Sequence, residues 1–352
     1  MTTARTSRSN RLLQILDGYR QILVVTHDNP DPDAIASGWA VTWMVEQKLR
    51  KPARLIGGGD IVRAENKHML HLLRPPIELV RSITCPPAAA VVLVDCGPGS
   101  QNHLFASDCV PPVAVIDHHS LNASRHAPRL AFRDIRPRIA ASATIAACYL
   151  REQKLNPSTQ LATALVYAIR TETRGCQTYH SRTDRSALLW LTERADFTRL
   201  ADIENAPLSI DYFSDMALAL QNTTLYDDAA FCLLPRASGA EIVGEVADLL
   251  IRCNTVRRVL CGAVVEGHLV ISVRTDYEAE NATDLVRSTL LGIGEGGGHS
   301  HRAGGKIPSI AGNPAIPADI EGELRRRWLA ACRLPLEGGR FLIARQEIVR
   351  NL

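Results

Sequence analysis

The sequence predicts an α/β protein with a parallel sheet in its first half and a smaller mixed α/β block in its second half. Short apolar runs rich in valine and isoleucine alternate with segments of helical periodicity up to residue 172. Strands that alternate with helices are typical of a parallel sheet that carries helices on both faces. A second alternating block, which contains a hairpin, begins near residue 229.

Length and composition narrow the class of protein. The chain has 352 residues, of which 46% are hydrophobic and 22% charged. This length favours two domains, and the composition excludes a disordered, collagen-like or coiled-coil protein. A net charge of +3 is not that of a protein that coats duplex nucleic acid. No apolar stretch approaches the roughly 18 residues of a membrane span, so we expect no membrane partner.

Cysteine usage indicates the compartment. The nine cysteines are scattered and form no CxxC pair. This pattern argues against a cysteine zinc site and against a disulfide scaffold. We therefore expect a reducing, cytoplasmic location.

The expected elements of the first half follow one another in βα order. Continuous apolar runs mark the strands, and apolar residues at helical spacing mark the helices. The expected strands are residues 21–27, 53–59, 89–97 and 112–119, and the expected helices are residues 33–49, 142–155 and 158–172.

The second half begins after a mostly helical, polar segment that contains Pro207. We expect domains at residues 1–200 and 229–352, joined by a helical connector at residues 201–228. The expected elements of the second domain are a strand at 230–235, a helix at 241–253, a hairpin at 257–275 that turns at residues 266–268, a helix at 281–290 capped by Asn281 and a last helix at 318–333.

A glycine-rich segment, GIGEGGGHSHRAGGK, occupies residues 292–306. It has too many glycines for a helix or a stable strand, which predicts a loop. Glycines let a backbone approach a phosphate and present N–H donors, and arginine binds phosphate through two hydrogen bonds. A flexible linker-like loop is the alternative. The expected substrate-binding residues are Arg274, Gly297, Gly298, His299 and Arg302.

Polar clusters follow three of the predicted strands. Ligands bind beyond the carboxyl ends of the strands in an open parallel sheet, so these clusters are expected to meet in space. Each cluster alone is typical of a turn or a helix cap, and their conjunction favours a site. The clusters are His27, Asp31 and Asp33, then Asp95, then Asp117, His118 and His119.

The residue types of these clusters point to metal chemistry. Carboxylates and imidazoles together suit Mn²⁺, Fe²⁺ or Co²⁺. Several crowded carboxylates cannot all stay ionised without cations that balance them. Two metal ions about 3.5–4 Å apart would make a site for phosphoryl transfer to water.

These motifs resemble those of the DHH phosphoesterase superfamily. The stretch HDNPDPDA at residues 27–34 is similar to its first motif, Asp95 to its second, and the residues DHH at 117–119 are its signature. SVRT at 272–275 and GGGHSHRAGG at 296–305 resemble the DHH-associated C-terminal domain. The resemblance covers roughly residues 20–310 and is greatest to the nanoRNase/oligoribonuclease branch.

The resemblance implies a two-domain enzyme with an active cleft between the domains and two divalent metal ions. Mn²⁺ is the expected metal, with Mg²⁺, Co²⁺ and Fe²⁺ as alternatives. Asp117 and His119 are implied to orient the ligands and handle protons. One ion is implied at His27, Asp31 and Asp95, and the other at Asp33, Asp95, His118 and an acid of a fourth motif.

The acid of the fourth motif departs from the family pattern. The stretch AIRTETRG places Glu172 where the family has an aspartate flanked by threonines. Glutamate is longer by one C–C bond, about 1.5 Å. We expect Glu172 to be a metal ligand, and the alternative is an exposed acid at a helix end.

The expected activity is a Mn²⁺-dependent phosphodiesterase that cleaves short single-stranded oligonucleotides or linear dinucleotides to nucleoside 5′-monophosphates. Asp95, Asp117, His118 and His119 are its expected catalytic residues. The alternatives are a phosphatase of 3′-phosphoadenosine 5′-phosphate (pAp) and a non-catalytic nucleotide sensor. Duplex nucleic acid is not expected as a partner, and the sequence leaves a homodimer open.

Overall fold

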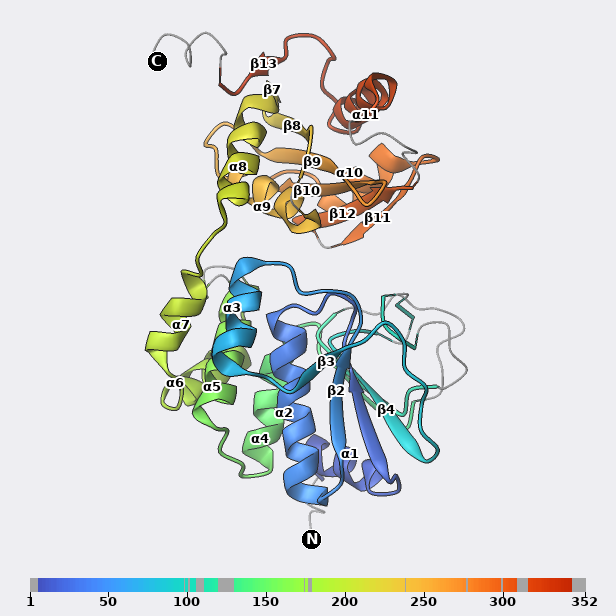
Figure 1. Cartoon of the computed structure of the whole chain (residues 1–352), viewed down its shortest axis with the longest axis vertical. Helices are drawn as coiled ribbons and strands as arrows, with labels where there is room; N and C mark the ends of the chain where they lie inside the picture. The colour runs from blue at the N-terminus through green and yellow to red at the C-terminus, as the bar shows by residue number, and fades with distance from the viewer. Residues whose placement is uncertain are drawn as a thin grey trace. The chain divides into compact units, whose positions relative to one another are not determined.

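The chain divides into two compact units, Met1–Pro207 and Leu208–Leu352 (Figure 1). Each unit has its own sheet and its own hydrophobic core. The boundary falls within the segment expected to connect two domains. The computed structural model describes residues 6–97, 99–100, 102–105, 111–119, 130–173, 175–176, 179–237, 239–276, 278–298, 300–308 and 316–343.

The N-terminal unit is built on a six-stranded parallel sheet with the strand order β3-β2-β1-β4-β5-β6. This confirms the predicted parallel α/β fold. The short strands β3 and β6 were not predicted, because three residues and the charged sequence FRDI give no apolar run. The strands are β1 (Gln21–Val25), β2 (Ala53–Gly57), β3 (Ile77–Leu79), β4 (Ala89–Val94), β5 (Ala114–Asp117) and β6 (Phe132–Ile135).

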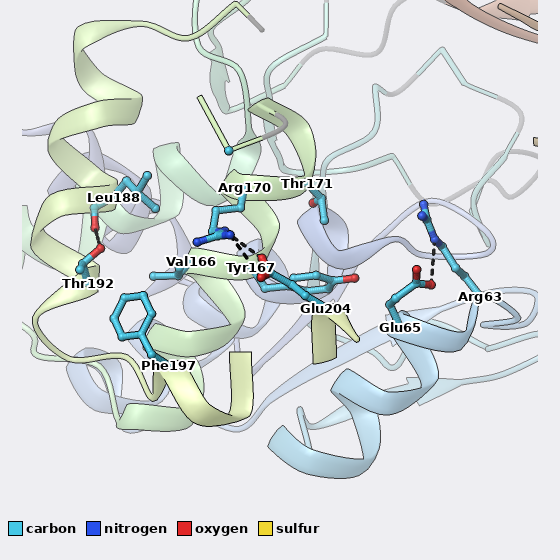
Figure 2. A pocket seen from close by; sticks show the side chains of 11 residues that line it. Arg63, Glu65, Val166, Tyr167, Arg170, Thr171, Leu188, Thr192, Phe197 and Glu204 are labelled. Carbon is cyan, nitrogen blue, oxygen red and sulfur yellow. Dashed lines mark hydrogen bonds and ion pairs between the residues drawn. The ribbon is translucent and has the colours of Figure 1, made fainter. Parts of the chain in front are cut away.

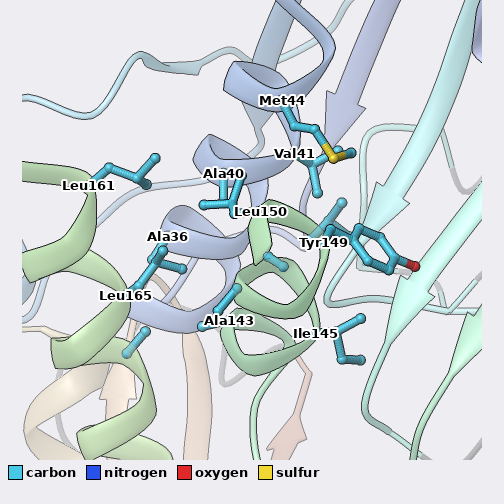
Figure 3. Packing of buried hydrophobic residues seen from close by; sticks show 14 of the residues in the cluster. Ala36, Ala40, Val41, Met44, Ala143, Ile145, Tyr149, Leu150, Leu161 and Leu165 are labelled. Atoms are coloured by element: carbon cyan, nitrogen blue, oxygen red, sulfur yellow. The ribbon is translucent and has the colours of Figure 1, made fainter. Parts of the chain in front are cut away.

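The helices of this unit pack against one face of the sheet, where Ile22, Val24 and Val92 point. Figure 3 shows Ala40 and Met44 on the central helix, α2, close to side chains of α4 and α5. Small residues on α2 allow this close approach. The helices are α1 (Arg8–Leu16), α2 (Pro32–Leu49), α3 (Ala64–Leu73), α4 (Ser142–Glu152), α5 (Thr159–Thr173), α6 (Arg182–Thr192) and α7 (Phe197–Glu204).

The opposite face of the sheet, formed by residues such as Leu23 and Leu93, has a smaller core. Its covering side chains include Val80, Ile83 and Phe105, which lie in connecting segments. Among the residues that the structure describes, connecting segments supply these covering side chains.

The C-terminal unit holds a mixed sheet with the order β11-β12-β10-β9-β8-β7-β13. Its strand β7 lies within the segment expected to be a helical connector, so that segment is helical only in part. No helix within the described ranges is long and apolar enough to cross a membrane. The elements are α8 (Ile210–Asn222), β7 (Thr223–Tyr226), β8 (Ala229–Leu234), α9 (Ala240–Leu250), β9 (Arg258–Val265), β10 (His268–Thr275), α10 (Ala282–Leu290), β11 (Glu295–Gly298), β12 (Arg302–Ile307), α11 (Ala318–Ala331) and β13 (Arg340–Phe341).

The glycine-rich segment contains two strands, so the expectation of a loop is wrong for these residues. Residues 295–298 and 302–307 form the antiparallel strands β11 and β12. Helix α10 packs directly on them, and a Cβ on Gly305 would lie 2.3 Å from Leu290 Cδ1. The glycines therefore serve close helix–sheet packing, which composition alone does not reveal.

A buried carboxylate ties β6 to two other parts of the N-terminal unit. Asp134 is fully buried and accepts hydrogen bonds from Arg136 Nη2 at 2.6 Å and from Tyr149 Oη at 2.6 Å. Arg8 of α1, which is half exposed, adds a contact at 2.7 Å. The Asp134 charge is compensated only while these donors surround it.

We predict that Asp134→Ala lowers the free energy of unfolding by about 3–5 kcal/mol, because it leaves the Arg136 charge and the Tyr149 hydroxyl without their partner. Arg8→Ala removes only the exposed partner and is expected to cost about 0–1 kcal/mol. Urea denaturation of both variants tests this. Equal midpoints for the two variants would contradict the account.

Candidate metal centre

Asp95 lies at the middle of the polar clusters. It follows β4 directly, is 3% exposed and has a φ of +61°. Its backbone N–H donates to the carbonyl of Ile116 at 3.0 Å, which extends the pairing of β4 with β5 past the end of the strand. A left-handed backbone at this point is uncommon for a residue other than glycine, and aspartate tolerates it better than most.

The two oxygens of Asp95 face different histidines. Oδ2 lies 3.6 Å from Nε2 of His27, and Oδ1 lies 3.5 Å from Nε2 of His118. The hydroxyl of Ser142, the first residue of α4, donates to Oδ1 at 2.9 Å. Ser142 was not identified from the sequence, where nothing distinguishes it from any other serine at a helix start.

Two groups of potential ligands share Asp95. His27, Asp31 and Asp95 form one group, and Asp95, His118 and His119 form the other. Within each group the donor atoms all lie within 4.8 Å of one another. The structure thus brings together residues from the ends of β1, β4 and β5, the strand ends at which the sequence placed them.

His27 and Asp31 are held by local bonds. The His27 ring is within hydrogen-bond distance of the carbonyl of Asp28, Nδ1 to O at 2.9 Å, so Nε2 is the nitrogen that faces Asp31 and Asp95. Asp31 caps α2, and its Oδ1 accepts the N–H of Asp33 at 2.9 Å and of Ala34 at 3.0 Å. Asp31 is therefore both a helix cap and a member of the cluster.

Asp33 is buried and also caps a helix, although a distant one. Its carboxylate accepts the backbone N–H groups of Ser142 and Ala143, each at 2.7 Å, at the N-terminus of α4. Its Oδ2 lies 3.7 Å from Nε2 of His118. A carboxylate has about four acceptor positions, so two N–H bonds leave Asp33 able to bind a metal ion.

Asp117 orients His119. Asp117, the last residue of β5, is fully buried, and its Oδ1 lies 2.8 Å from the Nδ1 of His119 and accepts that residue's backbone N–H at 3.0 Å. Its Oδ2 is buried without a hydrogen-bond partner among the described residues. The sequence-based view placed His119 behind the ligands, whereas a ring nitrogen of His119 also lies in the second ligand group.

The electrostatics of the cluster fit divalent cations. Burial lowers the pKa of His27, but hydrogen bonds to Asp31 and Asp95 and their charges outweigh it and raise this pKa to about 11. Burial, followed by the charges of Asp95 and Glu172, raises the pKa of Asp33 well above its usual range. Carboxylates this crowded attract positive charge, and the mixed oxygen and imidazole donors suit a divalent ion.

Glu172, the acid expected from the fourth motif, lies near enough to the cluster for its charge to act there. It lies near the end of α5 with an exposed side chain and belongs to neither ligand group. Its charge nevertheless acts on Asp33 and on His119, whose pKa values it helps to raise. The charge of Glu172 therefore reaches the cluster, and its role as a metal ligand stays a prediction.

The expected substrate-binding residues lie in the C-terminal unit. Arg274 is on β10, Arg302 begins β12, and Gly297 and Gly298 end β11. His299 lies outside the described residues. Arg274 and Arg302 both approach Asp248 of α9, a residue that the sequence did not single out.

The N-terminal unit also has a pocket of about 500 Å³ that the sequence did not indicate. Figure 2 shows Tyr167 and Phe197 in its wall, beside the ion pair between Arg170 and Glu204. Helix α5 contributes to this pocket and carries Glu172. None of the residues in the two ligand groups lines it.

The family comparison covers most of the N-terminal unit. Residues 21–169 match the DHH family, N-terminal domain. Members of the DHH superfamily are metal-dependent phosphoesterases. The aspartates and histidines that the sequence assigned to the family motifs are those that meet at the edge of the sheet.

Two proteins are similar to the chain over most of its length. An uncharacterized protein of Methanocaldococcus jannaschii is 29% identical over 315 residues, which are 88% of this chain, and the chain spans 63% of that relative's length. The crystal structure of an exopolyphosphatase-related protein from Bacteroides fragilis has a TM-score of 0.70 at 15% identity, covering 94% of this chain and 99% of that one. The latter likeness shows the fold of both units.

We predict that Asp95→Ala abolishes the binding of both metal ions, because the two ligand groups share this carboxylate. His27→Ala affects one group only and is expected to leave one ion bound. Equilibrium dialysis against Mn²⁺, followed by elemental analysis, measures the stoichiometry. Two ions per chain in Asp95→Ala would overturn the shared role of Asp95.

We predict that Asp33→Ala destabilises the chain by about 1–3 kcal/mol even in a metal chelator, because two N–H groups of α4 lose their acceptor. Asp60→Ala removes an exposed acid and is expected to stay within about 0.5 kcal/mol of the wild type. Urea denaturation in EDTA provides the comparison. An unchanged midpoint for Asp33→Ala would contradict the expectation that these two hydrogen bonds outweigh the repulsion between Asp33 and its neighbouring carboxylates.

Proposed function

We propose that this protein is a metal-dependent phosphodiesterase that hydrolyses short single-stranded oligonucleotides or linear dinucleotides to nucleoside 5′-monophosphates. The observation that carries the proposal is Asp95, whose two oxygens face separate histidines in two ligand groups. One carboxylate shared between two sets of donors fits a pair of metal ions about 3.5–4 Å apart, and such pairs support phosphoryl transfer.

The residues of the cluster fit distinct roles in this reaction. His27, Asp31 and Asp95 would hold one divalent ion, and Asp95 and His118, with Asp33 beside them, would hold the other. When bound, such ions activate water and neutralise charge on the reacting phosphate. Mn²⁺ is the metal that we propose for this set of oxygen and imidazole donors.

Asp117 and His119 supply the proton-handling part of the proposal. The contact between Asp117 Oδ1 and Nδ1 of His119 leaves Nε2 as the ring nitrogen that can exchange a proton. Asp117 thereby fixes the orientation of the ring, as an acid does for a catalytic histidine in general. His119 is accordingly the residue that we assign to proton transfer.

Features of the C-terminal unit support the proposal that the substrate is a small anion. Arg302, whose side chain is 46% exposed, offers a planar donor pair that matches a phosphate. The net charge of +3 suits a substrate with few phosphates better than a long nucleic acid, whose binding depends on many phosphate contacts. Short oligonucleotides and linear dinucleotides meet this condition.

We predict that the wild type with Mn²⁺ releases nucleoside 5′-monophosphates from a 5′-phosphorylated dinucleotide and a 5-mer, and spares a 24-mer. The reason is that few phosphates can be engaged at once. Product analysis on a panel that also contains pAp and pyrophosphate tests this, with Asp95→Ala as the inactive control.

The other outcomes of this assay contradict the proposal in different ways. Turnover of pAp alone would make the protein a phosphomonoesterase. No turnover of any substrate by a folded protein that binds nucleotides would favour the non-catalytic sensor. Rapid cleavage of the 24-mer would exclude a restriction to short substrates.

A further inference from the structure

Two arginines of the C-terminal unit occupy directly opposed positions in the sheet. Arg274 of β10 pairs with Arg302 of β12 in the antiparallel register. Like charges directly opposite each other on antiparallel strands repel and destabilise the pairing. A sheet that keeps both side chains near one another therefore needs a compensating negative charge.

Asp248 of α9 supplies that charge. Helix α9 packs on β9 and β10 (Figure 1). Asp248 lies near the C-terminal end of this helix. Its Oδ1 lies 2.7 Å from Nε of Arg274 and 3.6 Å from Nη2 of Arg302. One carboxylate thus reaches both guanidinium groups and leaves a net charge of +1 on the trio.

The two arginines differ in what they can offer a ligand. Arg274 is only 12% exposed, and its Nε donates to Asp248 Oδ1. Its Nη1 donates to the hydroxyl of Ser272 at 2.7 Å and to the carbonyl of Val273 at 3.1 Å. Its Nη2 lies 3.5 Å from Asp248 Oδ2. Arg274 therefore has most of its five N–H groups engaged within the unit. Arg302, at 46% exposure, is the more accessible group.

A second residue of α9 also lies close to the Arg274 guanidinium. Gly244 lies one turn before Asp248 on α9, and a Cβ there would be 3.4 Å from Arg274 Nη2. That distance is an ordinary van der Waals contact, so this part of α9 lies directly beside the guanidinium. Gly244 and Asp248, at positions i and i+4, form one helix face that receives Arg274.

We propose that Asp248 is a positioning residue that holds Arg274 and Arg302 as one unit and directs Arg302 to a terminal phosphate of the substrate. The chemical identity of the ligand rests on the proposed function, whereas the role of Asp248 rests on these contacts. Arg274, which the sequence suggested as a substrate contact, then acts mainly as the second anchor of the carboxylate.

A positioning role for Asp248 and its charge alone predict opposite changes in phosphate affinity when this carboxylate is removed. Removal of a negative charge beside an anion site strengthens anion binding by Coulomb attraction alone. If Asp248 positions the arginines, its removal lets the two like charges move apart and weakens the binding of phosphate. The direction of the change therefore separates the two explanations.

The test is calorimetric titration of 5′-AMP into the full chain in EDTA, which keeps metal-bound phosphate out of the measurement. Asp248→Asn is expected to weaken binding about tenfold, the loss of one charge-assisted contact. Glu266→Gln is the matched control, because it removes an exposed acid at the turn between β9 and β10. It is expected to bind within about twofold of the wild type.

A double-mutant cycle tests whether Asp248 acts through Arg302. Arg302→Ala alone is expected to weaken binding, and adding Asp248→Asn to it is expected to change binding little further. With the most rapidly cleaved substrate, Asp248→Asn is expected to raise KM with little change in kcat. A purely structural defect would lower the thermal stability of Asp248→Asn and leave the cycle additive.

The failure of this inference and of the proposed function are distinguishable. Equal or tighter 5′-AMP binding by Asp248→Asn, or additive effects in the cycle, would overturn the role of Asp248. The expected binding pattern without hydrolysis of any substrate would overturn the phosphodiesterase and keep the inference. No 5′-AMP binding by the wild type would overturn the role of Asp248, whereas the phosphodiesterase is decided by the product assay with Mn²⁺.

Discussion

Electrostatic repulsion at one edge of a parallel sheet is the constraint on which the N-terminal unit depends. Asp31, Asp33 and Asp95 lie together beside His27 and His118, and three carboxylates at such distances repel one another. Backbone donors offset part of this repulsion: the first turn of α2 binds Asp31, and the first turn of α4 binds Asp33. Helix N-termini carry partial positive charge, so both helices stabilise the same anionic cluster. The packing of α4 on α2 is therefore linked to the charge of the site, and divalent cations at the two ligand groups would balance the remaining negative charge.

In the C-terminal unit the groups that repel one another are positively charged, and a carboxylate offsets the repulsion. Its sheet register sets Arg274 opposite Arg302, and Asp248 joins them. In the proposed function, the acidic cluster would hold the metal ions, and Arg302, held through Asp248, would bind phosphate. Each is stabilised by groups of opposite charge from a neighbouring helix. This charge compensation by a neighbouring helix supports the proposed function, and in each unit it is seen in contacts within that unit.

The sequence predicted those parts of the structure that have a local signature. The apolar run of β1 and the polar residues directly after it were enough to place His27 at a strand end, and the same holds for Asp95. Strand β6 was not predicted, because Arg133 and Asp134 interrupt any apolar pattern. The glycines of β11 favour a loop by intrinsic preference, and only their packing against α10 shows why a strand forms there. The bonds from Asp33 to Ser142 and from Arg274 to Asp248 join distant segments, so no periodicity reveals them. Glu172 was expected as a metal ligand because of its position in a motif. The exposure of its side chain depends on where α5 ends, which the motif does not predict.

The central claim is that Asp95 is shared between two metal ions. The most direct measurement is anomalous diffraction from crystals of the full chain grown with Mn²⁺, recorded near the manganese edge. The account predicts two peaks, both in contact with the Asp95 carboxylate, one also in contact with His27 and the other with His118. No peak, or a single peak that does not touch Asp95, would contradict it.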